Sequence, residues 1–238
     1  MIKGLVTGGS RGIGREIVKE FAKRGYTTYF LYKSSDELAR ELEVQTGAIG
    51  IKCDVTVKEQ VSHAFEQIRK DGKGIDILVN NAGISEIVPF LDIKDHAWHN
   101  MMAVTLDGAY YCSKEGLTDM LVNKWGRIIN ISSMWGQTGA SCEVHYSTAK
   151  AGLIGMTKAL ALEFAPSGIT VNCIAPGIID TDMNREIEKG ALDEFVSSLP
   201  MERMGKAYEV ASLAGFLSSE ESGYITGQVF GVNGGAVT

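Results

Sequence analysis

The stretch Thr7-Gly8-Gly9-Ser10-Arg11-Gly12-Ile13-Gly14 decides the fold, because a short apolar run ends there in glycines and a helical pattern follows at once. A glycine-rich turn between a strand and a helix lets the backbone approach a pyrophosphate, and the helix adds free N–H groups and its positive dipole end. The spacing differs from GxGxxG, so a tight turn alone would also explain this cluster. Its place on the first strand of a βαβ series favours dinucleotide binding.

Short apolar runs alternate with longer helical patterns along the whole chain, which is typical of βαβ units that form a parallel sheet. Runs such as Ile128-Ile129-Asn130-Ile131 are too continuously apolar for a half-exposed strand and fit strands covered on both faces. We therefore predict one α/β domain over residues 1–238, with a doubly wound parallel sheet of seven strands. The expected strands are Ile2–Thr7, Thr27–Tyr32, Ala48–Cys53, Ile75–Val79, Arg127–Ile131, Thr170–Ile174 and Gln228–Val232. The expected helices are Ile13–Lys23, Asp36–Gln45, Lys58–Lys70, Trp98–Asn123, Tyr146–Phe164 and Tyr208–Ser218.

The composition is that of a soluble globular protein. Of 238 residues, 45% are hydrophobic and 22% are charged, which excludes disordered, collagen-like and coiled-coil classes. The formal net charge of -6 argues against binding to nucleic acid or to an anionic membrane. The four cysteines show no CxxC or Cys/His spacing, so we expect reduced thiols and no metal site. No signal-peptide pattern and no membrane-length apolar run is present, so a cytoplasmic protein is expected.

The residues after the predicted strand Thr27–Tyr32 bear on which dinucleotide binds. An acidic side chain at this tip would bind the ribose 2′-hydroxyl and repel a 2′-phosphate. The tip reads Lys33-Ser34, whereas Asp36 is expected in the first turn of the next helix, where a carboxylate favours the dipole. With Lys33, Ser34 and Arg11 at hand, we predict NADP(H) over NAD(H). The alternative is that Lys33 and Arg11 are ordinary solvated charges.

A second constellation follows the predicted strand Arg127–Ile131. Ser133 comes directly after it, and Tyr146-Ser147-Thr148-Ala149-Lys150 opens a helix. Because residues i and i+4 share a helix face, the Tyr146 hydroxyl and the Lys150 ammonium can lie side by side. The ammonium would then lower the pKa of the tyrosine, which could protonate a carbonyl oxygen that Ser133 orients. Alone the pattern is weak, and a surface helix pair is the alternative.

Ordered motifs over essentially the whole chain resemble the short-chain dehydrogenase/reductase family. These motifs are TGGSRGIG at 7–14, Asp54-Val55, NNAG at 80–83, Ser133, YSTAK at 146–150 and NCIAPG at 172–177. Within the family, GITVNCIAPGIIDTDM and ITGQVFGVNGG resemble the 3-oxoacyl-(acyl-carrier-protein) reductases of bacterial fatty-acid synthesis. The resemblance implies NADPH-dependent reduction of a 3-oxoacyl thioester to the 3-hydroxyacyl thioester.

The resemblance also implies roles for individual residues. Tyr146 matches the general acid, Ser133 the group that orients the substrate, and Lys150 the lysine that binds the nicotinamide ribose and tunes the tyrosine. The segment 180–200 matches a lid over the substrate. Together with the glycine turn and the tip after the second strand, the expected cofactor contacts are Gly8, Ser10, Arg11, Gly12, Ile13, Gly14, Lys33, Ser34, Asp54, Val55, Asn81, Ala82, Gly83, Tyr146, Lys150, Pro176, Gly177, Ile179 and Thr181.

One position departs from the family pattern. Relatives carry an asparagine where this chain has Thr105, and that asparagine completes a catalytic tetrad by holding a water that relays protons to the lysine. A threonine has a hydroxyl and no amide, so it can hold a water but cannot make both bonds. A slower enzyme or a nearly silent NADP(H)-binding subunit therefore stays open, as does a reductase of another carbonyl such as a steroid, sugar or quinone.

Two residues near the candidate site have no settled role. Trp135, two positions after the candidate serine, predicts either an apolar pocket wall or a packed loop anchor. His145 adjoins Tyr146 and is interpreted as a bystander that points away along the helix.

Partners are suggested more by resemblance than by charge. An acidic acyl carrier protein needs a basic docking patch, for which Lys124 and Arg127 are the nearest candidates, and a coenzyme A thioester is the alternative. The helix Tyr146–Phe164 is apolar on several faces, which suggests burial between subunits. The resemblance implies a homotetramer.

Overall fold

Parallel strands form one seven-stranded sheet through the middle of the described structure, as the sequence predicts. The strand order is β3-β2-β1-β4-β5-β6-β9, so the chain begins near the centre and winds outward in both directions. The computed structural model describes residues 2–70, 72, 74–184 and 188–238. The strands are β1 (Lys3–Thr7), β2 (Thr27–Tyr32), β3 (Ile49–Lys52), β4 (Ile77–Asn80), β5 (Gly126–Ile131), β6 (Ile169–Pro176) and β9 (Val229–Val232).

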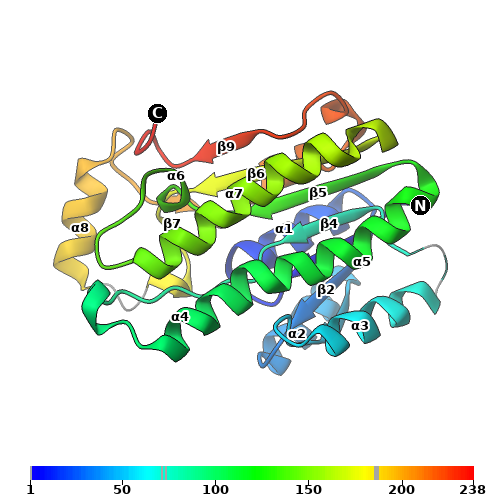
Figure 1. Cartoon of the computed structure of the whole chain (residues 1–238), viewed down its shortest axis with the longest axis horizontal. Coiled ribbons are helices and arrows are strands. Elements are labelled where there is room, and N and C mark those ends of the chain that lie inside the picture. Colours follow the sequence, from blue (N-terminus) through cyan, green and yellow to red (C-terminus); the bar gives the residue numbers. More distant parts are fainter. Residues whose placement is uncertain (1, 71, 73, 185–187) are drawn as a thin grey trace.

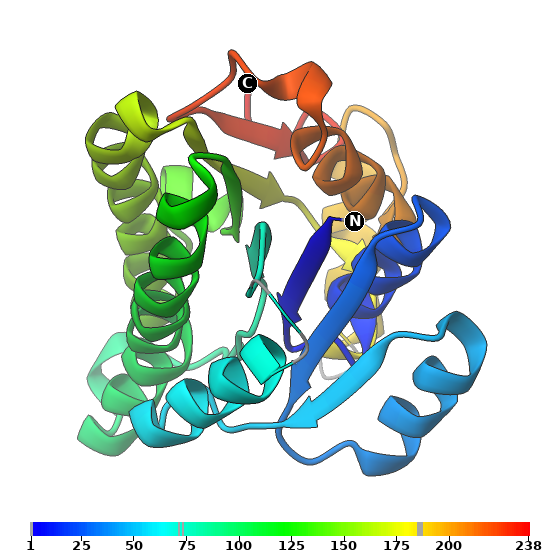
Figure 2. The same cartoon turned by 90° about the vertical axis from the view of Figure 1, so that its right-hand side faces the viewer.

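Helices cover both faces of the sheet, which makes the fold a doubly wound α/β domain (Figure 1 and Figure 2). One face carries α3 (Lys58–Lys70), α5 (Gly108–Asn123) and α7 (Val144–Phe164). The other carries α1 (Gly12–Lys23), α2 (Asp36–Thr46) and α9 (Ala207–Leu217). Every residue of β5 and β6 is buried, which explains why these strands read as continuous apolar runs.

The sequence predicted one helix over Trp98–Asn123, and the structure corrects this. α4 (Asp95–Met102) runs into a π-helical turn, η2 (Ala103–Asp107), before α5 begins. A π-turn adds a residue to the helix without interrupting it, so the apolar periodicity on either side does not reveal it.

The carboxyl ends of the parallel strands point to one edge, where the candidate functional loops meet. In Figure 1 the arrowheads of β6 and β9 point toward the side that holds α6 (Trp135–Thr138) and α8 (Lys189–Ser198). The pair β7 (Ile179–Asp180) and β8 (Gly205–Lys206) is also parallel. The short 3-10 turns are η1 (Phe90–Asp92), η3 (Ala165–Ser167), η4 (Asp182–Asn184) and η5 (Glu220–Ser222).

The predicted flap over 180–200 contains the helix α8, as its sequence suggested. Its residues 185–187 lie outside the described part of the chain. Of the helices that the structure describes, none has the length and apolar character needed to cross a membrane.

Candidate functional site

The glycine turn after β1 is tied to the loop after β4. Thr7 Oγ1 accepts the backbone N–H groups of Asn81 and Ala82 at 3.0 and 2.9 Å. The Asn81 amide Nδ2 donates to the carbonyl oxygens of Thr7 and Gly8 at 3.0 and 3.1 Å. These four bonds hold two strand ends side by side, so the predicted cofactor residues of both loops face the same space.

The local backbone of the glycine turn suits a bound anion. α1 is 12 residues long, and it has neither an acidic residue in its first turn nor a side-chain cap at Arg11. Its first N–H groups therefore lack helical partners and can donate to phosphate oxygens. Gly8 and Gly12 have φ of 63° and 54°, a region that favours glycine. A Cβ at Gly14 would clash with the Gly8 carbonyl oxygen, so the turn requires a glycine there as well.

At the tip of β2, Lys33 forms an ion pair. Its Nζ lies 2.6 Å from Asp54 Oδ2. Burial raises the pKa of the Asp54 carboxyl, but bonds from Lys33 and Thr56 outweigh it and hold that pKa below its ordinary value. Asp36 begins α2, as predicted, and its carboxylate accepts two bonds from Lys52 at 2.8 and 2.9 Å. The cation at this tip therefore comes from Lys33, while the nearby carboxylate of Asp36 is engaged by Lys52.

Ser133, Tyr146 and Lys150 meet where the loop after β5 lies against the first turns of α7. The Ser133 hydroxyl lies close enough to the Tyr146 phenol to lower its pKa, and all three residues are buried. The Trp135 backbone N–H donates to Ser133 Oγ at 3.1 Å. Lys150 Nζ donates to the carbonyl oxygen of Ile131 at 2.8 Å and lies 5.7 Å from the centre of the Tyr146 ring.

The prediction that Lys150 lowers the pKa of Tyr146 is wrong for this geometry. Burial raises the pKa of Tyr146 to about 12, the nearby Ser133 hydroxyl opposes this rise, and the Glu143 carboxylate adds to it. Burial also lowers the pKa of Lys150 to about 8. The Lys150 ammonium points to a backbone carbonyl rather than to the phenol. Tyr146 is consequently protonated at neutral pH, which is the form that donates a proton.

Thr105 lies in the π-turn η2 and is buried. Within the described residues its hydroxyl has no hydrogen-bond partner. Buried hydroxyls without a protein partner are uncommon, and an ordered water is the usual way to satisfy one. The position that departs from the family pattern therefore has a hydroxyl to which a water could bond.

The segment after β6 closes the same edge of the sheet. Pro176 accepts the Met134 N–H at 2.9 Å, and the Gly177 N–H donates to the Val232 carbonyl at 2.9 Å. Thr181 lies close to the glycine turn, since a Cβ at Gly12 would be 3.6 Å from its methyl group. The structure thus brings the predicted segment 176–181 next to both the glycine turn and the loop that holds the candidate serine.

Sequence reasoning missed a cluster just before Tyr146. His145, interpreted as a bystander, is fully buried, and its Nε2 lies 3.2 Å from Glu86 Oε2. Glu143 is partly buried, which raises its pKa, and it accepts a hydrogen bond from Ser85 Oγ at 3.5 Å. These contacts join the loop after β4 to the start of α7. The only signal in the sequence was two titratable residues within three positions of the tyrosine.

The suggested docking patch at Lys124 and Arg127 is also wrong. Arg127 is 3% exposed, stacks 4.3 Å from the Trp125 ring centre, and donates to the Ser219 carbonyl. Lys124 is exposed, but it precedes β5 and therefore lies at the edge opposite the candidate site. The stack on Trp125 and the bond to Ser219 hold the Arg127 guanidinium inside the protein, where it cannot contact a partner.

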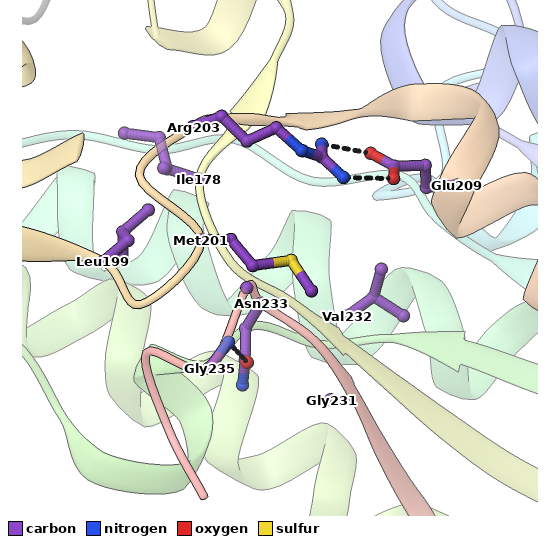
Figure 3. Close-up of a pocket in the computed structure, with 11 residues that line it drawn as sticks. Ile178, Leu199, Met201, Arg203, Glu209, Gly231, Val232, Asn233 and Gly235 are labelled. Carbon is purple, nitrogen blue, oxygen red and sulfur yellow. Dashed lines mark hydrogen bonds and ion pairs between the residues drawn. The ribbon is translucent and has the colours of Figure 1, made fainter. Parts of the chain in front are cut away.

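A cavity of about 310 Å³ lies behind the segment that follows α8 (Figure 3). The Arg203 guanidinium spans its rim and binds both carboxylate oxygens of Glu209, at 2.8 and 2.9 Å. The lining residues are Ile178, Leu199, Met201, Arg203, Gly205, Glu209, Gly231, Val232, Asn233, Gly234 and Gly235. Neither the candidate serine nor the tyrosine nor the lysine lines this cavity. Within the described residues, no group of three or more His, Cys, Asp or Glu could hold a metal ion.

The fold and the site are those of a nucleotide-dependent oxidoreductase. The doubly wound parallel sheet has an uncapped helix at its glycine turn, and a serine, a tyrosine and a lysine are buried at the same edge. The family model described as Enoyl-(Acyl carrier protein) reductase matches residues 8–237. This chain belongs to the short-chain dehydrogenase/reductase family.

Full-length relatives agree with this assignment. The chain is 42% identical to the 3-oxoacyl-[acyl-carrier-protein] reductase of Aquifex aeolicus (strain VF5), over 97% of this chain and 95% of the relative. It is 41% identical to the enzyme of the same name from Haemophilus influenzae, over 97% and 96% of the two chains. It is 40% identical to the acetoacetyl-CoA reductase of Shinella zoogloeoides, over 97% and 96%.

Proposed function

We propose that this protein reduces a 3-oxoacyl thioester to the 3-hydroxyacyl thioester in fatty-acid-type synthesis, with NADPH as the reductant. The observation that carries the proposal is that Ser133, Tyr146 and Lys150 are buried together at the edge where the glycine turn opens. Relatives named for 3-oxoacyl-[acyl-carrier-protein] and for acetoacetyl-CoA support this substrate class.

Tyr146 is suited to act as the acid in this direction. When bound, the nicotinamide supplies a hydride to the carbonyl carbon, and the carbonyl oxygen then needs a proton. A phenol whose pKa is raised to about 12 keeps its proton at neutral pH. It still transfers that proton readily to an alkoxide, because an aliphatic alcohol is a weaker acid than a phenol. Ser133 donates a second hydrogen bond to the same oxygen and orients it.

Lys150 and Thr105 have supporting roles in the proposal. With a pKa lowered to about 8, Lys150 is still mostly charged at neutral pH and has three N–H groups, of which one binds Ile131. The remaining N–H groups would hold the ribose hydroxyls of the cofactor. A water on the Thr105 hydroxyl would return protons toward this lysine.

The cofactor residues predicted from the sequence fit the described backbone. The uncapped start of α1, with Gly8, Ser10, Gly12, Ile13 and Gly14, would hold the pyrophosphate. In the proposal, the loops of Asp54–Val55 and 81–83 contact the adenosine half, and 176–181 contacts the nicotinamide half.

The preference for NADPH is supported by the charges at the tip of β2. Lys33 is exposed at this tip and is followed by the exposed Ser34, and Arg11 is an exposed cation in the glycine turn, whose Gly9 N–H donates to the Leu31 carbonyl near the end of β2. The carboxylate of Asp36, which would otherwise attract a ribose hydroxyl, accepts two bonds from Lys52. A 2′-phosphate would compete with Asp54 for the Lys33 ammonium, and both anions can share one lysine because it has three donors.

We also propose a homotetramer that acts in the cytoplasm on thioesters of acyl carrier protein or coenzyme A. On α7 the residues Ala151, Gly155, Ala159 and Leu162 are exposed and recur on one helix face. Leu162 is 83% exposed, which is costly for an isolated subunit. In Figure 2, α7 lies beside α5, which exposes Val122 at 82%. These surfaces support burial between copies of the chain.

Turnover measurements test the proposed function directly. The purified protein is mixed with acetoacetyl-CoA or 3-oxobutanoyl-acyl carrier protein and with NADPH or NADH, and loss of reduced-nicotinamide absorbance is followed. Mass spectrometry of the product should show the 3-hydroxy thioester, with NADPH used in clear preference to NADH. Equal use of NADH at low concentration would contradict the cofactor assignment. Intact NADPH binding without turnover of either thioester would contradict the substrate assignment.

A further inference from the structure

The aromatic pair Trp135 and Phe195 joins two segments that flank the candidate site. Trp135 begins α6, directly after the loop of Ser133, and Phe195 lies in α8. Their ring centres are 5.8 Å apart with an interplanar angle of 63°, an edge-to-face contact of favourable geometry. Both side chains are partly buried. The helix α8 therefore rests on the catalytic loop through a ring-to-ring contact.

Trp135 also touches the surroundings of the candidate acid. Its side chain packs with Ile84 and Met102 against a buried cluster that contains Tyr146 and Met101. Its backbone N–H holds Ser133 Oγ at 3.1 Å. The indole is thus anchored from both sides and forms a fixed wall next to the two hydroxyls that would bind a substrate carbonyl. Any chain that extends from that carbonyl toward α8 meets this wall.

The two ends of a 3-oxoacyl thioester have different needs. The thioester end carries a bulky carrier or coenzyme A and must lead to solvent, whereas the acyl end can be enclosed. The loop after β4 is an open flank, since Ile87, Phe90 and Leu91 are 58%, 60% and 93% exposed. The side formed by Trp135 and Phe195 is closed by two rings from separate segments. The acyl tail therefore points toward the ring pair and the carrier toward the open flank.

We propose that Trp135 and Phe195 form the end wall of the acyl site and limit the substrate to short 3-oxoacyl thioesters. This inference rests on the proposed function and makes it more specific, because it names a chain-length class. The residues act by occupying the space that further methylene groups would need.

The test compares chain lengths in the wild type and in variants. The ratio of kcat/KM for 3-oxododecanoyl-CoA to that for acetoacetyl-CoA is measured with NADPH in the wild type, Trp135→Ala and Phe195→Ala. We expect the wild type to favour the short thioester and each variant to raise the ratio at least tenfold, since each methylene that gains an apolar site contributes a factor of about four. The double variant should raise the ratio by less than the product of the two single-variant increases, because both substitutions open the same wall.

Matched controls separate this role from a general loss of structure. Trp135→Phe keeps an aromatic ring and frees less space than alanine, so the ratio should rise by less than in Trp135→Ala. Ser197→Ala changes the same helix at an exposed side chain that bonds only within α8, so the ratio should not move. A wild type that reduces both thioesters with an unchanged ratio in Trp135→Ala and Phe195→Ala would overturn the inference while leaving the proposed function intact. A wild type that reduces neither thioester would overturn both.

Discussion

Replacing Gly14 by alanine should disrupt the phosphate end of the site. A Cβ at this position would clash with the Gly8 carbonyl oxygen and lie 2.5 Å from the Asn81 amide nitrogen, where ordinary contact begins at 3.4 Å. Neither neighbour can yield cheaply, because one is backbone and the other makes the two bonds that join the glycine turn to the loop after β4. Relief of an overlap of this size costs about 1–3 kcal/mol. For a domain of this length that corresponds to a melting temperature lower by about 2–12 °C.

The same displacement would move the N–H groups that receive the pyrophosphate. We expect NADPH affinity, measured by fluorescence titration or calorimetry, to fall at least tenfold in Gly14→Ala. Gly190→Ala is the control, because the atoms near a Cβ there belong to the flexible side chain of Glu188. It should keep both the melting temperature and the affinity. At about 2–4 °C per kcal/mol, a change in melting temperature below 1 °C would mean a cost well under the expected one. A Gly14→Ala protein with so small a change that also binds NADPH as well as the wild type would refute the steric argument.

Three further perturbations have expected outcomes of known sign. Cys142 is not a glycine but has a φ of 60°, in the left-handed region that favours glycine. Cys142→Gly should therefore raise the free energy of unfolding, measured by urea denaturation, by roughly 0.5–1 kcal/mol. A loss of stability would mean that other contacts already compensate the backbone strain. Thr105→Asn should raise kcat because an amide can hold a relay water with two bonds; an unchanged kcat would show that the threonine hydroxyl suffices. Because burial lowers the pKa of Lys150 to about 8 from 10.5, the unfolded chain holds this proton between these values, and Lys150 contributes a gain in stability as pH rises from 8 to 10, against a loss from the buried cysteines, whose pKa values burial raises. That gain should vanish in Lys150→Met, and its persistence in denaturation curves would assign it to another group.

The strands of the parallel sheet could be predicted because buried strands leave a direct mark on the sequence. β5 and β6 are buried throughout, so they must be apolar on both faces, and the alternation with helices then requires parallel pairing. The assignment of Asp36 to the first turn of α2 followed in the same way from its position before a helical pattern. These are local consequences of burial and of helix electrostatics.

Tertiary contacts decided the features that could not be predicted. The direction of the Lys150 ammonium depends on the Ile131 carbonyl, which belongs to another element. His145 is buried because the loop of Glu86 covers it, and no periodicity in α7 indicates that cover. The π-turn around Thr105 leaves the helical spacing intact on both sides. Family resemblance pointed to the serine, tyrosine and lysine, which the structure brings together at one edge of the sheet, whereas the electrostatics around them required the structure.

The central claim is that the Tyr146 hydroxyl protonates the substrate oxygen. The most direct test is single-turnover reduction of acetoacetyl-CoA by preformed complexes of NADPH with wild type and with Tyr146→Phe, which removes one oxygen and leaves the ring in place. Loss of a positioned acid lowers such rates by about 10²–10⁴-fold. We predict a loss of this size with NADPH affinity unchanged. A Tyr146→Phe protein that turns over within about threefold of the wild type, far less than the loss expected for an acid, would show that the proton comes from another group.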